Sequence, residues 1–369
     1  MRIAYAVMGY GRGHAMRTAA VLPALERDHD VRVFAGRDAH DMLARDHDSV
    51  EIPVIGYQYG SNGRICPRRT MLRNAPLVAD LLAAGPRTRA VWQQMADFAP
   101  DIVISDSETY GHRFARHHGI PRIGFDHVGI MAYCHCDFAP GDAFAGIRDG
   151  LGYRAFMGDP DRVIVSSFYP ARPRRDTVQM VGPILREPVR KATPIRGERV
   201  LVYLNKGAHQ YTAALDTALR ACGEDVVVYG TARRGKSANL EFKAPSQQGF
   251  IDDLAAAKAV LSTAGNQLLS EAVYLGKPVL ALPEDAVEQR LNAQAIVSMG
   301  VGASAPLHKL SLTCLGAFLE NADTHAAATA GHRSDGLADA TAALRRHIHT
   351  LSRRPRPAPG AIARLTGAY

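Results

Sequence analysis

Short apolar runs recur along the chain, and longer segments with apolar residues at helical spacing separate them. In the first half these runs cover residues 2–8, 31–35, 101–105, 120–125 and 162–166. Their length and their content of β-branched residues predict β-strands, and residues 75–98 predict a long helix between the second and third strands. Because strands alternate with helices, a parallel sheet covered on both faces is favoured.

The same alternation begins again after a proline- and charge-rich stretch that ends at Arg199. Four new apolar runs follow, in the segments RVLVYLN, EDVVVYG, KAVLST and KPVLALP. We therefore predict an α/β protein of two doubly wound, Rossmann-like domains that face a cleft, where ligands bind beyond the carboxyl ends of the strands. The predicted units are a first domain over 1–183, a linker over 184–199, a second domain over 200–345 and a Pro/Arg-rich tail over 346–369.

Composition supports this organisation and narrows the class of protein. The chain has 369 residues, and 47% of them are apolar, enough for two buried cores. No window approaches the roughly 20 apolar residues of a membrane span, and the first apolar run is too short for a secretory signal, so we expect a cytoplasmic protein. The five cysteines are scattered, and Cys134 and Cys136 stand too close together for a usual zinc pair. We expect no disulfide framework and no metal site.

The net charge of +8 is concentrated in two places. Residues 171–199 hold eight lysines and arginines against three acids, and residues 345–369 hold six arginines and no acid. Such runs suit phosphate-bearing partners, nucleic acid or an anionic membrane surface, although they are more often ordinary solvated surface. Peripheral contact with an anionic surface is therefore one hypothesis.

The most specific pattern lies in the second half, over residues 261–293. A strand ends at Ser262, a turn with a glycine follows, and a helix begins near Gln267. The free backbone N–H groups of a helix start bind anions, and Gly265 lets a phosphate approach the backbone closely. Glu271 lies one turn into the helix, where its carboxylate could accept hydrogen bonds from a ribose diol. The residues predicted around the phosphate are Thr263, Ala264, Gly265, Asn266 and Gln267.

A second polar group follows the next buried strand. After the segment GKPVLALP, an acidic loop reaches Glu288 and Gln289, which are placed to bind sugar hydroxyls, and Asn292 follows on a helix. The order of glycine turn, helix with Glu271, GKP strand, acid–glutamine pair and Asn-Ala resembles the donor-binding half of GT-B glycosyltransferases. The resemblance is greatest to the MurG-like and UDP-glycosyltransferase-like inverting enzymes.

This resemblance implies further contacts in the second domain. Asn205, Lys206 and Gly207 follow the domain's first strand, where such enzymes carry a polar loop that faces the diphosphate. Phe250 stands where the family places a residue against the nucleotide base, and packing in the core is an equally weighted alternative. The implied co-substrate is a nucleotide sugar, UDP-linked in the first instance, with no other cofactor.

In the first domain the resemblance gives the segment GYGRGH a role. Inverting GT-B enzymes place a histidine just after the first glycine turn as general base on the acceptor hydroxyl, and His14 occupies that position. A carboxylate orients such a histidine, and the segment PDIVISD ends with Asp106, the predicted partner, with Asp126 in reserve. The residues predicted on the acceptor side are Gly11, Arg12, Gly13, Asp126 and His127, and residues 57–73 are a predicted acceptor loop.

Other interpretations of these motifs are weaker. A dinucleotide fingerprint needs G-x-G-x-x-G and an acid at the tip of the second strand, but position 14 is histidine and Gly36-Arg37 follows that strand. Retaining GT-B enzymes pair two glutamates, whereas Thr263 stands where the partner of Glu271 would be. We therefore predict metal-independent, inverting sugar transfer to a hydroxyl acceptor, either a small molecule or a lipid-linked group. Transfer to modified bases of DNA, a GT-B-fold UDP-sugar 2-epimerase and a non-catalytic nucleotide-sugar binding protein remain alternatives.

Overall fold

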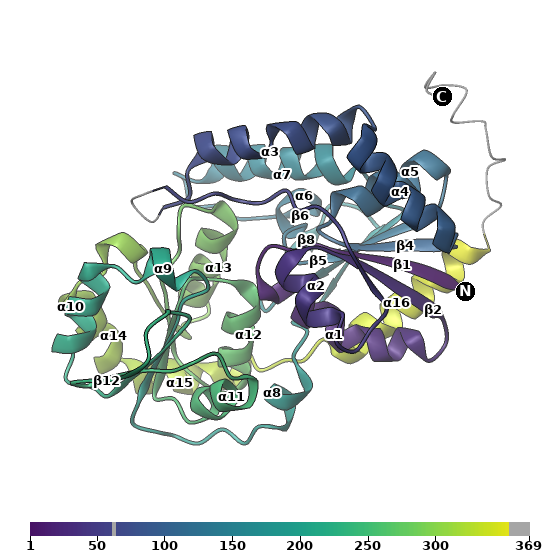
Figure 1. Cartoon of the computed structure of the whole chain (residues 1–369). Helices are drawn as coiled ribbons and strands as arrows, with labels where there is room; N and C mark the ends of the chain where they lie inside the picture. Colours follow the sequence, from purple (N-terminus) through teal and green to yellow (C-terminus); the bar gives the residue numbers. More distant parts are fainter. Residues whose placement is uncertain (61–63, 354–369) are drawn as a thin grey trace.

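The computed structural model describes residues 1–60 and 64–353. Within them the chain forms two α/β halves, each built on a seven-stranded sheet, that lie against each other (Figure 1). A small antiparallel sheet of β6 (Cys134–His135) and β8 (Arg172–Pro173) accompanies the first half.

The first sheet is parallel throughout, with the strand order β3-β2-β1-β4-β5-β7-β9. Its strands are β1 (Arg2–Val7), β2 (Asp30–Ala35), β3 (Ser49–Glu51), β4 (Ile102–Asp106), β5 (Arg122–Asp126), β7 (Arg162–Ser166) and β9 (Val178–Val181). Five of them match the predicted runs. The two edge strands, β3 and β9, were not predicted because they are short and carry a weak apolar signal.

Alternation along the strands divides the first core into two layers. Ile3, Tyr5 and Val7 of β1 face one side with α1, α2 and α16, whereas Ala4 faces the other side with α4 and α5. Both faces are therefore covered, as in a doubly wound sheet. The helices of this half are α1 (Arg12–Glu26), α2 (Arg37–Leu43), α3 (Pro67–Leu82), α4 (Pro86–Phe98), α5 (Thr109–His118), α6 (Ile130–Tyr133), α7 (Ala143–Met157) and α16 (Leu337–Ser352).

The second sheet has the order β12-β13-β11-β10-β14-β15-β16, and only the edge strand β12 runs antiparallel. Its strands are β10 (Val200–Tyr203), β11 (Val226–Tyr229), β12 (Gly235–Ser237), β13 (Leu240–Phe242), β14 (Ala259–Ser262), β15 (Val279–Ala281) and β16 (Gly302–Ser304). Its helices are α9 (Gly207–Gln210), α10 (Ala213–Ala221), α11 (Gln247–Ala255), α12 (Asn266–Tyr274), α13 (Val287–Ser298), α14 (Leu312–Glu320) and α15 (Ala322–Ala328), with short 3₁₀ turns at Leu307–Lys309 and Thr329–Gly331. The linker carries the short helix α8 (Glu187–Lys191).

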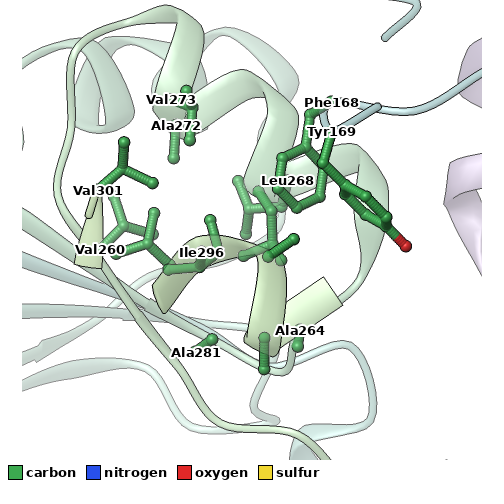
Figure 2. Close-up of a cluster of buried hydrophobic side chains, with 14 of the residues drawn as sticks. Phe168, Tyr169, Val260, Ala264, Leu268, Ala272, Val273, Ala281, Ile296 and Val301 are labelled. Carbon is green, nitrogen blue, oxygen red and sulfur yellow. The ribbon is translucent and has the colours of Figure 1, made fainter. Parts of the chain in front are cut away.

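An apolar core joins the two halves behind the strand ends. Phe168 and Tyr169, which follow β7, belong to the same buried cluster as Leu268 of α12 and Val260 of β14. Figure 2 shows the two aromatic rings beside Leu268. The relative position of the halves is therefore held by continuous packing as well as by the linker.

The chain returns to the first half at its carboxyl end. Helix α16 packs its buried residues Ala340, Leu344 and Ile348 into the core beside α1 and beneath β4 and β7. The predicted boundary at residue 345 therefore falls inside a continuous helix, and that helix belongs by packing to the first domain. Residues 337–352 are amphipathic, which suits a helix, but this pattern does not indicate which sheet the helix covers. The predicted tail is described only to Arg353.

Candidate functional site

The carboxyl ends of the strands in both sheets bring the two glycine turns together. The first turn leads from β1 into α1, where Gly11 has a φ of 84° that favours glycine. A Cβ atom placed on Gly11 would lie 3.6 Å from Asn205 Nδ2, and one on Gly13 would lie 3.6 Å from the Cβ of Gln267. The first turn of α1 therefore faces the diphosphate loop and the start of α12 that the sequence predicts.

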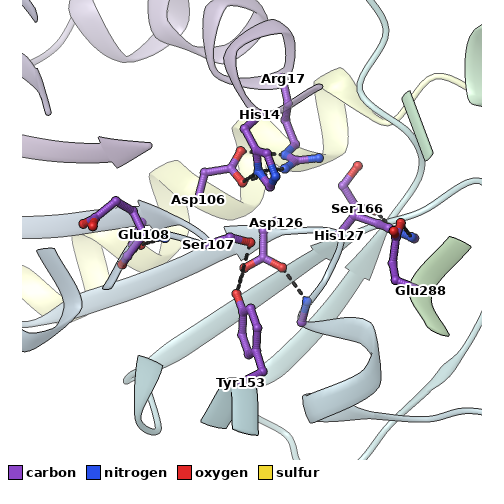
Figure 3. Close-up of polar contacts among 12 residues, drawn as sticks. His14, Arg17, Asp106, Ser107, Glu108, Asp126, His127, Tyr153, Ser166 and Glu288 are labelled. Carbon is purple, nitrogen blue, oxygen red and sulfur yellow. Dashed lines mark hydrogen bonds and ion pairs between the residues drawn. The ribbon is translucent and has the colours of Figure 1, made fainter. Parts of the chain in front are cut away.

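His14, in the first turn of α1, contacts Asp106 at the end of β4. The distance from His14 Nδ1 to Asp106 Oδ1 is 2.6 Å (Figure 3). The Asp106 side chain is fully buried, whereas 17% of the His14 side chain is exposed. Donation from Nδ1 to the carboxylate leaves the lone pair of Nε2 as the free basic position of the ring.

A third residue, Arg17, completes this group. Its Nε and Nη2 atoms donate to the two carboxylate oxygens of Asp106 at 2.8 and 2.6 Å, and Nη2 also lies 3.2 Å from His14 Nδ1. Burial alone would raise the pKa of Asp106, but the charges and hydrogen bonds of Arg17 and His14 outweigh it and lower that pKa. Asp106 is thus held as an anion. Sequence reasoning missed Arg17, although its position one helical turn after His14 was a usable signal.

Asp126 lies close by but has its own partners. Its two carboxylate oxygens accept hydrogen bonds from the Tyr153 hydroxyl at 2.5 Å and from the backbone N–H of Gly129 at 2.6 Å. Burial, with the nearby charge of Asp106, raises the pKa of Asp126. The structure therefore gives His14 a contact with Asp106 and not with the reserve candidate. Ser107, beside Asp106, takes a left-handed backbone with φ 54° and lies 3.3 Å from the Tyr153 hydroxyl.

On the donor side, α12 begins at Asn266 with Gly265 as its N-cap and no side chain that caps it. Thr263 and Ala264 are buried, and Asn266 Oδ1 is buried without a hydrogen-bond partner in the described part of the chain. The N-terminal amides of this helix are therefore left for a ligand, as the predicted phosphate turn requires.

Glu271 is not open to the cleft in this structure. Its side chain is 1% exposed, and Arg186 of the linker donates to both of its oxygens, at 2.7 and 2.5 Å. Gln267 Nε2 donates a third hydrogen bond to the Glu271 carboxylate at 2.8 Å. The same nitrogen donates to the backbone carbonyl of Ile184 at 3.1 Å. The carboxylate predicted to bind a ribose diol thus joins α12 to the linker. Arg186 was not predicted, because it lies far from Glu271 in the sequence.

Glu288 and Gln289 begin α13 and differ in their surroundings. Glu288 accepts a hydrogen bond from Asn292 at 2.6 Å, its side chain is 22% exposed, and burial raises its pKa to about 6. Gln289 accepts from the backbone N–H of Glu284 at 2.8 Å and so orders the loop in front of it. Of the pair, Glu288 is the one that reaches the first domain, with its Oε1 3.4 Å from His127 Nε2.

The remaining predicted donor residues fall into two groups. Lys206 points back to the first domain, with its Nζ 3.6 Å from Asp38 Oδ2 and 5.2 Å from the centre of the Tyr10 ring. Asn205 is exposed, and Gly207 lets the loop approach the backbone of Gly230. Phe250 is packed edge-on against Tyr203 and Tyr229, with ring centres 5.2 Å away in both cases, so the structure supports the core alternative for its side chain.

Comparisons with known proteins agree with this geometry. A model of glycosyl transferase family 1 matches residues 1–322. The chain belongs to this family. No curated protein matches the chain.

Solved structures extend the comparison to the fold. The calicheamicin glycosyltransferase CalG4 has a TM-score of 0.65 at 18% identity, over 95% of this chain and 98% of that one. The glycosyltransferase VinC in complex with dTDP has a TM-score of 0.63 at 16% identity, over 96% of this chain and 100% of that one. MurG of Acinetobacter baumannii has a TM-score of 0.59 at 13% identity, over 94% of this chain and 99% of that one. The predicted GT-B fold and the predicted enzyme class, a glycosyltransferase, are confirmed.

In this glycosyltransferase His127 links the two domains instead of facing open cleft. Its Nδ1 lies 2.9 Å from the backbone carbonyl of Ser166 and its Nε2 lies 2.9 Å from Asn292 Oδ1 of the second domain, and a neutral ring donates to one of these two oxygens. Tyr169 donates to the same Asn292 oxygen at 3.0 Å. Burial lowers the pKa of His127 to about 4, so the ring is neutral near neutral pH.

The predicted acceptor loop of the glycosyltransferase also reaches the second domain. Tyr59 stacks on His209 with ring centres 4.8 Å apart and donates to Glu284 at 3.4 Å. Arg64 binds both carboxylate oxygens of Asp285, at 2.6 and 2.7 Å. Residues 61–63 of this loop lie outside the described residues. Arg12 is exposed, and its charge acts on Tyr203 of the second domain.

The basic run at 171–199 does not form a free cationic surface. Six of its eight cationic side chains have carboxylate partners in the described residues: Arg175, Arg186, Arg190, Lys191, Arg196 and Arg199. Arg174 donates to the carbonyl of Cys134. Among the described residues there is no helix long and apolar enough to cross a membrane and no group of three or more side chains placed to hold a metal ion.

Proposed function

We propose that this glycosyltransferase moves a sugar from a nucleotide diphosphate donor to a hydroxyl acceptor with inversion at the anomeric carbon. The observation that carries the proposal is the position of the His14–Asp106 pair at the turn that faces the start of α12. A proton acceptor and an anion site then lie on opposite walls of one cleft.

In the proposed step, Nε2 of His14 takes the proton of the acceptor hydroxyl as its oxygen attacks the anomeric carbon. The bond from that carbon to the diphosphate oxygen breaks at the same time, and the nucleoside diphosphate leaves with the electron pair. Asp106 stabilises the imidazolium that forms. The uncapped amides of α12 and its dipole stabilise the charge on the leaving diphosphate, and we propose that no divalent metal is required.

A donor panel tests the proposal. The full chain is incubated with UDP-, dTDP- and GDP-linked sugars, with and without a mixture of hydroxyl compounds, and release of the nucleoside diphosphate is measured in the presence of EDTA. We name UDP sugars first because of the sequence resemblance and dTDP sugars second because the similar VinC structure contains dTDP. Acceptor-dependent release, with the product anomer inverted in NMR, supports the proposal.

The matched variant is His14→Ala. Removing a general base lowers rate by about 10²- to 10⁴-fold, while nucleotide binding to the second domain should be unchanged. Release that survives in His14→Ala contradicts the assignment of the base. Sugar conversion without an acceptor would instead indicate an epimerase, binding without turnover a nucleotide-sugar binding protein, and turnover only with DNA a base-modifying transferase.

A further inference from the structure

Over residues 144–151, helix α7 exposes its large apolar side chains and buries only glycines. Phe144, Ile147 and Leu151 follow one another at helical spacing and are 80%, 57% and 60% exposed. The buried side holds Gly146 and Gly150, where a Cβ would lie 2.5 Å from the Phe138 ring and 2.6 Å from the Met131 carbonyl. This is the reverse of the usual pattern for a helix on a sheet, whose apolar stripe faces the core. The packing of the domain therefore does not account for the apolar side chains on the outer face of α7.

Helix α3 adds apolar and cationic side chains of the same kind. Met71 and Leu72 are 66% and 69% exposed, and Arg68, Arg69 and Arg73 are exposed around them. None of these three arginines has an ion pair among the described residues. Exposed apolar groups of this size, ringed by cations, are characteristic of interaction sites.

The two helices form one rim of the first domain. Figure 1 shows α3 and α7 along the same edge of the first domain. The segment at Tyr57 connects them: its neighbour Gln58 donates to Thr70 of α3 at 2.9 Å, and the charges of Arg148 and Asp149 on α7 act on Tyr57 itself. Tyr57 also meets Tyr10, beside the glycine turn, with ring centres 5.7 Å apart.

Few acids oppose the cations on this rim. The carboxylate of Asp80 in α3 is bonded to the start of α4. It accepts hydrogen bonds from the backbone N–H and from the hydroxyl of Thr88, both at 2.8 Å. Asp149 pairs with Arg148 at 2.7 Å, and Arg148 is 65% exposed. The outer surface is consequently apolar and positive, which complements a surface that offers both hydrocarbon and negative charge.

We propose that this surface binds an anionic phospholipid bilayer. We call it the lipid face, and it consists of Met71, Leu72, Phe144, Ile147 and Leu151 with Arg68, Arg69, Arg73 and Arg148. The apolar side chains enter the boundary between headgroups and acyl chains, and the arginines meet lipid phosphates. If the proposed function holds, the mouth of the acceptor cleft then lies at the membrane, next to hydroxyl groups carried on lipids.

The test is co-sedimentation of the full chain with vesicles, which requires no catalytic activity. Vesicles of phosphatidylglycerol and phosphatidylcholine are compared with phosphatidylcholine alone, at low and high salt. We expect binding to the anionic vesicles that weakens with salt, because part of the attraction is electrostatic. The combined variant Phe144→Ser, Ile147→Ser and Leu151→Ser should lose about tenfold or more in vesicle affinity, since three exposed apolar side chains are removed.

Two further variants keep the test decisive. Arg68→Gln, Arg69→Gln and Arg73→Gln together should reduce binding to anionic vesicles at low salt. Leu312→Ser with Val297→Ser removes exposed apolar groups of the second domain, 46% and 50% exposed, and should leave vesicle binding unchanged. Nucleotide binding and thermal unfolding identify any variant that has not folded.

Three results would overturn the proposal. The wild-type chain does not bind the anionic vesicles, the serine variant binds them as well as the wild type, or the serine variant converts a dimer to a monomer in light scattering without any change in vesicle binding. The last result would show that a second copy covers this face. A failure of sugar transfer in the donor panel leaves the vesicle result intact, so the two proposals are tested separately.

Discussion

The facing walls of the two domains differ in which of their polar groups are already hydrogen-bonded. On the first wall His14, Asp106 and Arg17 bond one another, and within the described residues Nε2 of His14 has no hydrogen-bond partner. On the second wall the Glu271 carboxylate is hydrogen-bonded to Arg186 and Gln267. The groups without a side-chain cap there, among the described residues, are the backbone amides at the start of α12. One wall therefore offers an ordered side chain to a ligand, and the other offers main-chain amides.

Asp106→Asn should have the largest effect on the first wall. The substitution leaves the buried Arg17 guanidinium without its anion, which costs about 3–5 kcal/mol of unfolding free energy. It also removes the charge that stabilises a protonated His14, so we expect transfer to fall about 10²- to 10⁴-fold. Urea unfolding and transfer rates measure the two losses. His14→Asn is the matched control, because it should lose activity and keep stability; equal stability of Asp106→Asn and wild type would contradict the assignment.

Arg186→Met tests whether the Arg186–Glu271 ion pair of the second wall stabilises the fold as much as the Asp106–Arg17 pair of the first wall. It leaves Glu271 buried and unpaired, and we expect about 3–5 kcal/mol of lost stability. The double variant Arg186→Met with Glu271→Leu should recover most of this loss, because no uncompensated charge remains. Urea unfolding of the two variants decides the point. If the double variant is no more stable than the single one, the ion pair is not the main function of these residues.

Glu288→Gln should have a smaller, pH-dependent effect. The folded-state pKa of about 6 exceeds the ordinary value of 4.5, so the ionised form penalises folding above pH 6 and the penalty disappears as pH falls through 6 to 4.5. Glutamine should stabilise the protein at pH 7.5 by up to about 2 kcal/mol and have little effect at pH 4.5. Chemical denaturation at the two pH values measures this, and an identical gain at both would refute it.

Arg64→Ala should have the smallest effect. Both partners of the Arg64–Asp285 pair are largely exposed, 48% and 40%, so water screens the interaction. We expect a change in unfolding free energy of about 0.2–1 kcal/mol that shrinks in high salt. A larger loss, measured by urea unfolding, would mean that the loop joins the domains more strongly than the exposure of this pair indicates.

Part of the fold was accessible from sequence because its signals are local. Buried parallel strands such as β4 and β10 read as continuous apolar runs, and the turns after β1 and β14 carry glycine. The short edge strands β3 and β12 were missed because they hold few apolar residues. The placement of α16 was missed because its periodicity shows that it covers a sheet, not which one.

The candidate site also combines residues that were predicted from the sequence with contacts that were not. The resemblance to inverting GT-B enzymes predicted the pairing of His14 with Asp106, and in the structure the adjacent strands β1 and β4 bring the two side chains together. Arg17 required knowing which face of α1 meets Asp106. Glu271 was predicted to bind a ribose, but the tertiary structure brings Arg186 from the linker to its carboxylate. His127 was predicted beside the acceptor and instead joins Asn292 across the domains.

The central strands of both sheets, the glycine turns that follow them and the residue types at those turns could be read from the sequence. These features depend on neighbours within a few positions, where apolar period and glycine act directly. The sequence did not reveal which charges are neutralised, which carboxylates remain open and which apolar side chains stay in water. Each of these depends on contacts between residues far apart in the chain, which form only in the folded structure. Phe144 and Leu151 are the clearest example. Their helical spacing is that of an apolar stripe that packs against a core, but α7 packs through Gly146 and Gly150 instead, so the stripe faces water.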